Sequence, residues 1–250
     1  MADQSVVEQL KQGTPIWNEW KARQPRDPLL DLSGINFAEA NVHLEGIDLT
    51  FCDLRGCNLS GFQAPAAHFN FADLRGANLS RMNLRSANFE FADLSGAILA
   101  GALLERASFG VTNLTGANLS GANLGEANLS NANLHHTTLA GADLWRALFL
   151  QSSLKGTDFS ACLLSSTVFG EVDLREIRGL DHIRPDAEVY LDIHSLYWSE
   201  GNIPEPFLRA AHLPPSFLAL LPTLNFEEDD DDREGNEPEP PEENVKSQTS

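Results

Sequence analysis

The sequence predicts an all-β solenoid, and two periodicities carry that prediction. From about Ala40 to Arg175, a Leu or Phe recurs at every fifth residue, and a small residue, usually Ala, stands two positions before it. Residues of the same kind also recur every twenty residues, so four segments of five make one coil. We expect about seven coils, stacked at the strand spacing of about 4.8 Å.

The five-residue period requires a bend in every repeat. On a helix it would place successive Leu side chains about 140° apart, and on a strand it would send them to opposite faces. With one bend per repeat, the Leu slot and the small-residue slot both point inward. Asn, Asp, Gly and Ser fill most of the three outward positions, as bending backbone prefers.

The twenty-residue period appears in aromatic residues and in glycines. An inward column contains Phe69, Phe89, Phe109, Phe149 and Phe169, with Leu129 in the same series and Phe159 outside it. Glycines recur in the same way at 56, 76, 96, 116 and 156. We expect each residue to stack on its equivalent one coil away, a distance that suits offset-stacked rings.

Two departures from the pattern are expected to be local. Ala64 occupies a Leu slot while Phe62 occupies the preceding small slot, which roughly conserves core volume. Leu32, Phe37 and Val42 are five residues apart but two residues out of frame with the later repeats. We therefore expect one slip around Val42–Ile47, in the first coil.

Residues 1–28 are predicted to form a helical cap on one end of the solenoid, which spans 29–176. A short helix covers Ser5–Lys11, and Thr14-Pro15 is typical of an N-cap followed by proline at the first helical position. Ile16, Trp17 and Trp20 share one face of the second helix, which we expect to close the open coil. A partner-binding role for the two tryptophans is the alternative.

Residues 177–224 are predicted to cap the other end, and 225–250 to form a disordered acidic tail. Pro206 and Pro215 stand where the first turns of short helices would lie. The chain carries 36 acidic and 17 basic residues, a net charge of −19, and much of the excess lies in the tail. The tail is also poor in apolar residues, which is typical of disorder.

This charge disfavours direct nucleic-acid binding, because phosphate contacts need Lys and Arg. The N-terminus has no basic and apolar signal segment, and no apolar run is long enough to span a membrane. The three cysteines, Cys52, Cys57 and Cys162, all occupy the small slot as apolar fillers, and their odd number favours a reducing compartment. We expect a cytoplasmic protein.

The repeats A-N-L-S-G, A-D-L-S-G and F-A-D-L-R-G resemble the pentapeptide repeat family, written A-(D/N)-L-x-x. The resemblance covers about 27 contiguous units. It implies a right-handed quadrilateral β-helix, and the handedness comes from the family alone.

A second resemblance concerns residues 199–214, S-E-G-N-I-P-E-P-F-L-R-A-A-H-L-P. This stretch is similar to the segment that joins the repeats to a Toll-receptor-like signalling domain in some bacterial members. The acidic tail follows it instead, so we expect that domain to be absent.

One column of outward residues is the candidate docking site for a protein partner: Phe51, Phe71, Phe91 and Val111. Aligned exposed rings mark partner sites, but a ladder that only stabilises the coils, or one lying under the N-terminal helices, is the alternative. Other outward apolar residues, for which a cover by the C-terminal segment is favoured over a partner, are Ile98, Leu103, Trp145, Leu148, Leu163 and Val168. Arg55, Arg75, Arg81 and Arg85 are interpreted as solvated surface.

No catalytic residue, cofactor or metal ligand is predicted. His135 and His136 are adjacent without a further ligand at metal-site spacing, and the common nucleotide-binding, hydrolase and zinc motifs are missing from the sequence. A core filled with Leu and Ala leaves no cleft for a small-molecule substrate. We therefore do not expect an enzyme.

Three functions remain. The favoured one is a non-catalytic scaffold or adaptor that binds an unknown protein partner. The resemblance to pentapeptide proteins suggests a second, inhibition or protection of a type II topoisomerase (gyrase) by DNA mimicry, for which the family implies a homodimer. The third is the sensor or adaptor part of a signalling protein that lacks its effector domain.

Overall fold

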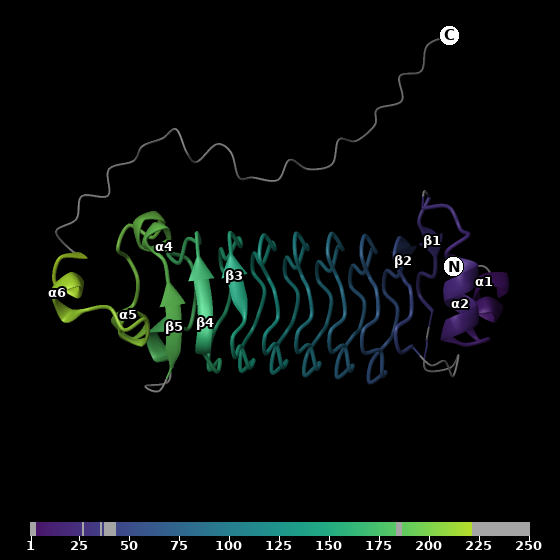
Figure 1. Ribbon diagram of the computed structural model, residues 1–250, viewed down its shortest axis with the longest axis horizontal. Coiled ribbons are helices and arrows are strands. Elements are labelled where there is room, and N and C mark those ends of the chain that lie inside the picture. Colours follow the sequence, from purple (N-terminus) through teal and green to yellow (C-terminus); the bar gives the residue numbers. More distant parts are fainter. Residues whose placement is uncertain (1–3, 27, 36, 38–43, 184–186, 222–250) are drawn as a thin grey trace, which may run out of the picture.

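The chain winds into a coil whose successive turns stand in a row along the long axis of the molecule (Figure 1), and residues of neighbouring turns pair in parallel. The computed structural model describes residues 4–26, 28–35, 37, 44–183 and 187–221. Single backbone bridges join residues twenty apart along the whole coil, from Asp48–His68 to Asp143–Leu163. The predicted class, a repeat solenoid built on a twenty-residue coil, is confirmed.

Regular strands are short because each side of the coil bends again after a few residues. At one end, β1 (Leu30–Asp31) pairs in parallel with β2 (Cys52–Asp53). At the other end, β3 (Leu148–Leu150), β4 (Ser165–Gly170) and β5 (Glu188–Leu191) form a parallel sheet in that order. Between these two sheets, neighbouring coils are joined by isolated parallel bridges between residues twenty apart.

The Leu and Phe slots fill the interior as predicted. Phe69 stacks on Phe89 with ring centroids 4.8 Å apart, and Phe89 stacks on Phe109 at 5.0 Å. Phe149 stacks on Phe169 at 5.1 Å, and Phe159 meets Phe149 edge-on at 5.6 Å. All of these rings are fully buried, so the coils share one continuous apolar core.

Small polar residues in the inward slot bond to the neighbouring coil. The Thr112 hydroxyl donates to the Phe89 carbonyl at 2.7 Å, and other buried Thr and Ser side chains repeat this contact, namely Thr137, Ser152, Thr157 and Thr167. Cys52, Cys57 and Cys162 are free and buried, and burial raises the pKa values of their thiols to about 12, 11 and 12. They are neutral fillers, as predicted.

The Asn or Asp before each Leu shapes the corner that follows. Its side-chain oxygen accepts a hydrogen bond from the backbone N–H two residues on, as between Asn118 Oδ1 and Ser120 N at 3.0 Å. This Asx turn recurs along the solenoid, for example at Asn58, Asn78 and Asp158. The repeat motif therefore supplies its own turn chemistry.

The predicted frame slip in the first coil is present. Phe37 N donates to Asn58 O, twenty-one residues on, whereas Gly46 N donates to Pro65 O, nineteen residues on. The first coil therefore has two extra residues, between Phe37 and Leu44; Val42 itself lies outside the described residues. The exchange at Phe62 and Ala64 is partial, since Ala64 is fully buried while Phe62 packs half-buried against the core.

Helices α1 (Gln4–Leu10) and α2 (Thr14–Lys21) lie at the N-terminal end of the solenoid (purple in Figure 1). Trp17 is buried, and its indole N–H donates to Asp48 O at 2.7 Å. The Asn18 side chain donates to Gly46 O at 2.9 Å and accepts from Asp48 N at 2.8 Å. It thus forms hydrogen bonds with the backbone of this coil that a preceding coil would otherwise form.

Two details of α2 differ from the prediction. The N-cap is Gly13, one residue earlier than Thr14. Ile16 is 48% exposed and does not share the buried face of Trp17, because only one side of this short helix meets the coil.

At the C-terminal end, a short 3-10 turn, η1 (Leu180–His182), precedes β5, and α4 (Ile193–Trp198) follows it. Ser195 Oγ accepts from Val172 N at 3.1 Å, Ser199 Oγ from Leu174 N at 3.0 Å, and the Asp192 carboxylate from Glu171 N at 3.0 Å. Side chains thus complete the hydrogen bonds of the last coil, whose backbone would otherwise be an open edge.

Helices α5 (Glu205–Ala210) and α6 (Pro215–Leu218) complete this end, with proline in the first turn of each, as predicted. Phe207 of α5 is buried edge-on against Phe169, at 5.3 Å between centroids. The predicted acidic tail, 225–250, lies outside the described residues. Among the described helices, none is both long and apolar enough to cross a bilayer.

Candidate docking surface

The predicted docking residues occupy equivalent corners of four successive coils. At such a corner, the N–H of the small slot donates to the carbonyl of the Leu or Phe slot, as Ala72 N does to Phe69 O at 3.0 Å. The second of the two intervening residues has a positive φ, which is the geometry of a type II turn. Phe51, Phe71, Phe91 and Val111, together called the aromatic ladder below, all hold this position.

Their backbone geometry is unusual for bulky side chains. The φ angles are 53°, 59°, 61° and 56°, a left-handed region that costs an L-residue about 1–2 kcal/mol. Glycine takes the equivalent corner position elsewhere, as at Gly56 and Gly96. The turn itself would therefore favour glycine at the four ladder positions.

Stacking between coils offsets part of that cost. Phe51 and Phe71 stack with centroids 4.7 Å apart and planes within 6°, and Phe71 and Phe91 stack at 4.9 Å and 2°. Such pairs contribute about 0.5–1.5 kcal/mol each beyond burial. The rings cover each other's faces, so their edges are directed to solvent.

The ladder is exposed except at its first ring. Phe71, Phe91 and Val111 are 44%, 51% and 50% exposed. The guanidinium of Arg26, just after the N-terminal helices, lies 5.3 Å from the centre of the half-buried Phe51 ring. The alternative that the N-terminal helices cover the ladder is therefore wrong for Phe71 and Phe91, while a purely stabilising role is untested.

A column of acids runs beside the ladder. Arg55 forms a two-bond contact with Asp53, at 2.8 and 2.6 Å, and Arg75 forms the same contact with Asp73, at 2.9 and 2.6 Å. The hydrogen bond from Arg55 lowers the pKa of Asp53 below its ordinary value. Asp93 lacks an arginine of its own, and Arg75 approaches it only to 3.8 Å.

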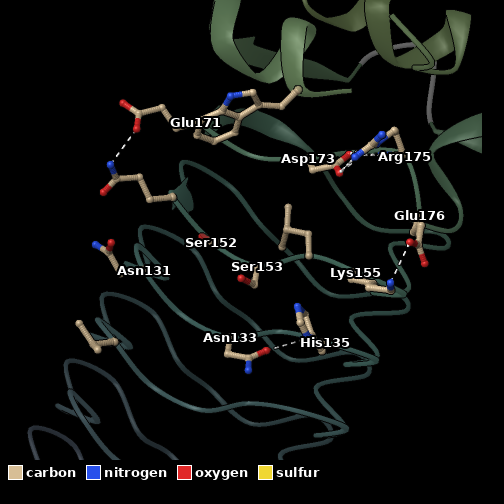
Figure 2. A pocket seen from close by; sticks show the side chains of 14 residues that line it. Asn131, Asn133, His135, Ser152, Ser153, Lys155, Glu171, Asp173, Arg175 and Glu176 are labelled. Atoms are coloured by element: carbon tan, nitrogen blue, oxygen red, sulfur yellow. Dashed lines mark hydrogen bonds and ion pairs between the residues drawn. The ribbon is translucent and has the colours of Figure 1, made fainter. Parts of the chain in front are cut away.

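Beyond Val111 the same face opens into a polar groove of about 560 Å³ (Figure 2). Asn131, Gln151 and Glu171, which continue the ladder's column, line the groove together with Trp198 of α4. Lys155 pairs with Glu176 at 3.1 Å, and Arg175 pairs with Asp173 at 2.7 Å. With these charges paired, the groove offers a polar surface of mixed charge.

Among the described residues, one cluster has metal-ligand chemistry: Glu171, Asp192 and His194, whose ligand atoms lie within 4.8 Å of one another. Asp192 already accepts hydrogen bonds from Ser195 N and Glu171 N, and Glu171 accepts one from Gln151. These contacts tie α4 to the last coil. The predicted lack of a metal or cofactor stays a prediction, as does the lack of catalytic residues.

The other outward apolar residues are only partly covered. Ile98, Trp145 and Leu163 are 42%, 44% and 39% exposed, whereas Leu103, Leu148 and Val168 are half-buried. The preferred expectation, a cover by the C-terminal segment, agrees with the structure at Val168, which pairs with Tyr190 of β5. Ile98, Trp145 and Leu163 stay exposed beside the described residues 187–221, so no such cover is seen over these three.

Sequence reasoning missed Arg26, the groove and the serine contacts of α4. Arg26 lies in the linker after α2, and Trp198 lies in a segment without repeats. Because neither residue belongs to the repeat, the five-residue spacing does not predict which face of the coil it contacts. The only sequence signal for the groove was the ladder's own column, which turns polar after Val111.

The fold defines a repeat protein whose coils enclose a solid apolar core. The model of pentapeptide repeats matches in eight copies, over residues 30–62, 66–101, 92–131 and 127–165. The chain belongs to the pentapeptide repeat family.

Similar solved structures include HetL, a pentapeptide repeat protein involved in heterocyst differentiation regulation from the cyanobacterium Nostoc sp. strain PCC 7120. It is 31% identical, with 60% of this chain and 70% of HetL covered and a TM-score of 0.28. A pentapeptide repeat protein of the Arabidopsis thaliana thylakoid lumen is 31% identical over 45% of this chain and 68% of its own, with a TM-score of 0.28.

Full-length QnrB1, a plasmid-mediated fluoroquinolone resistance protein, is 22% identical over 69% of this chain and 96% of its own, with a TM-score of 0.37. No curated protein sequence matched. Family membership rests on the repeat match, which covers more than half of the chain.

Proposed function

We propose that this protein is a non-catalytic scaffold or adaptor and that the aromatic ladder is its docking site for a protein partner. The observation that supports it is the placement of Phe71, Phe91 and Val111. Each is about half exposed at a backbone position that favours glycine. Aromatic side chains that are exposed in a continuous row are typical of partner surfaces.

The proposal includes the form of the scaffold: a right-handed coil of about seven turns with helical caps at both ends. The twenty-residue register supports the coil, and the contacts of Asn18, Ser195 and Ser199 with the terminal coils support the caps. A rigid core lets the outer columns keep their spacing when a partner binds.

DNA mimicry has less support. The acidic column beside the ladder is interrupted by the paired arginines Arg55 and Arg75, so a continuous negative face is missing from the described part of that side. A gyrase supercoiling assay, with and without a quinolone, tests this alternative directly. The proposal of a signalling protein without its effector domain has no further support here.

Affinity capture with matched variants tests the docking role. Phe71→Ser combined with Phe91→Ser removes the two exposed rings, and Ile98→Ser combined with Leu163→Ser removes a similar exposed apolar area on other sides of the coil. We expect the first variant to lose the captured partner and the second to keep it, with circular dichroism showing that both are folded. Equal capture by both variants would contradict the docking role.

A further inference from the structure

The ladder's geometry restricts what can lie on it. Its rings stack along the solenoid axis within 6° and 2° of parallel, so each inner face is already occupied by a neighbouring ring. The outer face of Phe51 is taken by Arg26. An occupant therefore meets a straight row of ring edges, which suits apolar side chains better than a cation placed over a ring.

The spacing of the rings indicates which secondary structure of a partner fits along the row. The rings repeat every 4.7 to 4.9 Å. A helix lying along the row presents one side chain per turn, about every 5.4 Å, whereas a strand presents one about every 6.7 Å. Over the three steps from Phe51 to Val111, the mismatch is about 2 Å for the helix and about 6 Å for the strand. A helix of about three turns, roughly eleven residues, follows the whole ladder.

The charges beside the ladder determine the sign of the charge that a partner must carry. At Phe71, the neighbouring Asp73 is 14% exposed and lies within 4 Å of both Arg75 and Arg55. At Phe91, Asp93 is 38% exposed and 3.8 Å from its nearest arginine, and Glu90 precedes the ring on its other side. The excess negative charge therefore gathers at the Phe91 end, and the chain's net charge of −19 has the same sign.

We propose that the aromatic ladder binds one amphipathic helix of a partner protein, with its apolar stripe on the ring edges and Lys or Arg residues beside Glu90 and Asp93. This inference rests on the proposed docking function and adds the chemistry of the partner. Because the acids are paired with arginines at the Phe51 and Phe71 end and are in excess at the Phe91 end, the charge pattern also orients the bound helix. A contact of this length is smaller than a standard stable interface of about 1,600 Å², so the complex is a transient one.

Two model peptides test the partner's chemistry on the full chain. The probe is a fluorescent fourteen-residue amphipathic helix of Leu and Lys, and its control has Glu at every Lys position. Fluorescence anisotropy measures binding to the wild type, to Phe71→Ser/Phe91→Ser, to Glu90→Gln/Asp93→Asn, and to Ile98→Ser/Leu163→Ser.

The Leu–Lys peptide is expected to bind the wild type and the Ile98/Leu163 variant alike. Affinity falls at least about tenfold for the Phe71/Phe91 variant, and the Glu90/Asp93 variant binds more weakly with a shallower dependence on salt. The Leu–Glu peptide does not bind. Equal binding of the Leu–Lys peptide to wild type and the Phe71/Phe91 variant would assign it to general charge attraction and overturn the inference.

Failure of this inference can be told from failure of the docking function. If the Phe71/Phe91 variant loses its captured partner while the Leu–Lys peptide does not bind the wild type, the ladder docks a partner of another kind and only the helix is wrong. If the variant keeps both the captured partner and the peptide, both proposals are wrong.

Discussion

Val111 is, among the described residues of positive φ, the one with a β-branched side chain. Branching at Cβ makes the left-handed region a true outlier for this residue. The strain persists because the coils on either side hold the corner in place, through backbone bonds such as Val111 N to Ser130 O at 3.3 Å. At the residue scale, the ladder is thus maintained against the local backbone preference.

We expect Val111→Asn to stabilise the protein. Asn tolerates positive φ, and Asn131 already occupies the equivalent corner one coil away with a φ of 60°. The expected gain is about 1 kcal/mol in the free energy of unfolding, measured by urea denaturation. Ile98→Asn, at an exposed position outside the positive-φ corners, is the control and should bring no gain; an equal gain there would contradict the backbone explanation.

Single-residue placement could be predicted wherever the period applied. The Leu slots, the small slots with their cysteines, and the outward ladder follow from spacing alone, because every coil puts the same position in the same environment. Arg26 could not be placed, because its contact with Phe51 depends on how α2 docks.

At the scale of elements, the two ends show how a parallel coil is terminated. The side-chain amide of Asn18 in α2 both donates to and accepts from the first coil. Ser195 of α4 and Ser199 at its C-cap have hydroxyls that accept from the last coil. Prolines in α5 and α6 predicted helices at the C-terminal end. The serine contacts were not predictable, because serine is equally common in the outward repeat positions.

Acid should weaken the C-terminal cap through Asp192. Burial acts to raise the pKa of Asp192, but hydrogen bonds from Ser195 and Glu171 N hold it below the ordinary Asp value. A lowered pKa stabilises the fold above the unfolded value of about 3.9, and this contribution is lost as pH falls through the folded value.

We therefore expect Asp192→Asn to lower the free energy of unfolding by about 1 kcal/mol at pH 7, as loss of an N-cap does, and by less at pH 3. Urea denaturation at both pH values measures the difference. Glu205→Gln, a charge change on the exposed surface of α5, is the control. A loss for Asp192→Asn that is the same at pH 7 and pH 3 would show that ionisation of Asp192 does not contribute.

At the scale of the whole molecule, each coil contacts only its neighbours, so stability is approximately a sum of coils and interfaces. A defect in the middle therefore disturbs coils on both sides, whereas a defect near an end frays only that end. The same locality explains why the fold class was predictable from a short period, without any long-range information.

Leu114→Arg should unfold several central coils. Leu114 is fully buried, and a charge placed there would cost at least about 4 kcal/mol. Thr115→Arg is a matched control, because its outward column already carries Arg55, Arg75 and Arg175. Thermal melting by circular dichroism should show a large loss for the first variant and little change for the second. An unchanged melt for Leu114→Arg would contradict the inward assignment.

The candidate site was predictable only as far as it belongs to the repeat. The ladder is a column of the repeat itself, whereas the groove beyond it needs Trp198, which α4 brings from a segment with no period. The whole surface therefore required the three-dimensional arrangement of repeat and cap.

Because five residues make one side of the coil and twenty make a full coil, the number of repeat residues determines how far one end of the molecule is rotated about the axis relative to the other. Deletion of twenty residues from the middle, such as 122–141, would remove one complete coil. The rotation of α4 about the solenoid axis relative to α2 would then stay the same. Loss of five would instead turn the C-terminal helices by about a quarter of a revolution around the axis. The length of the solenoid and the rotation of one end relative to the other can thus be changed separately, by deleting or inserting whole coils or single five-residue sides.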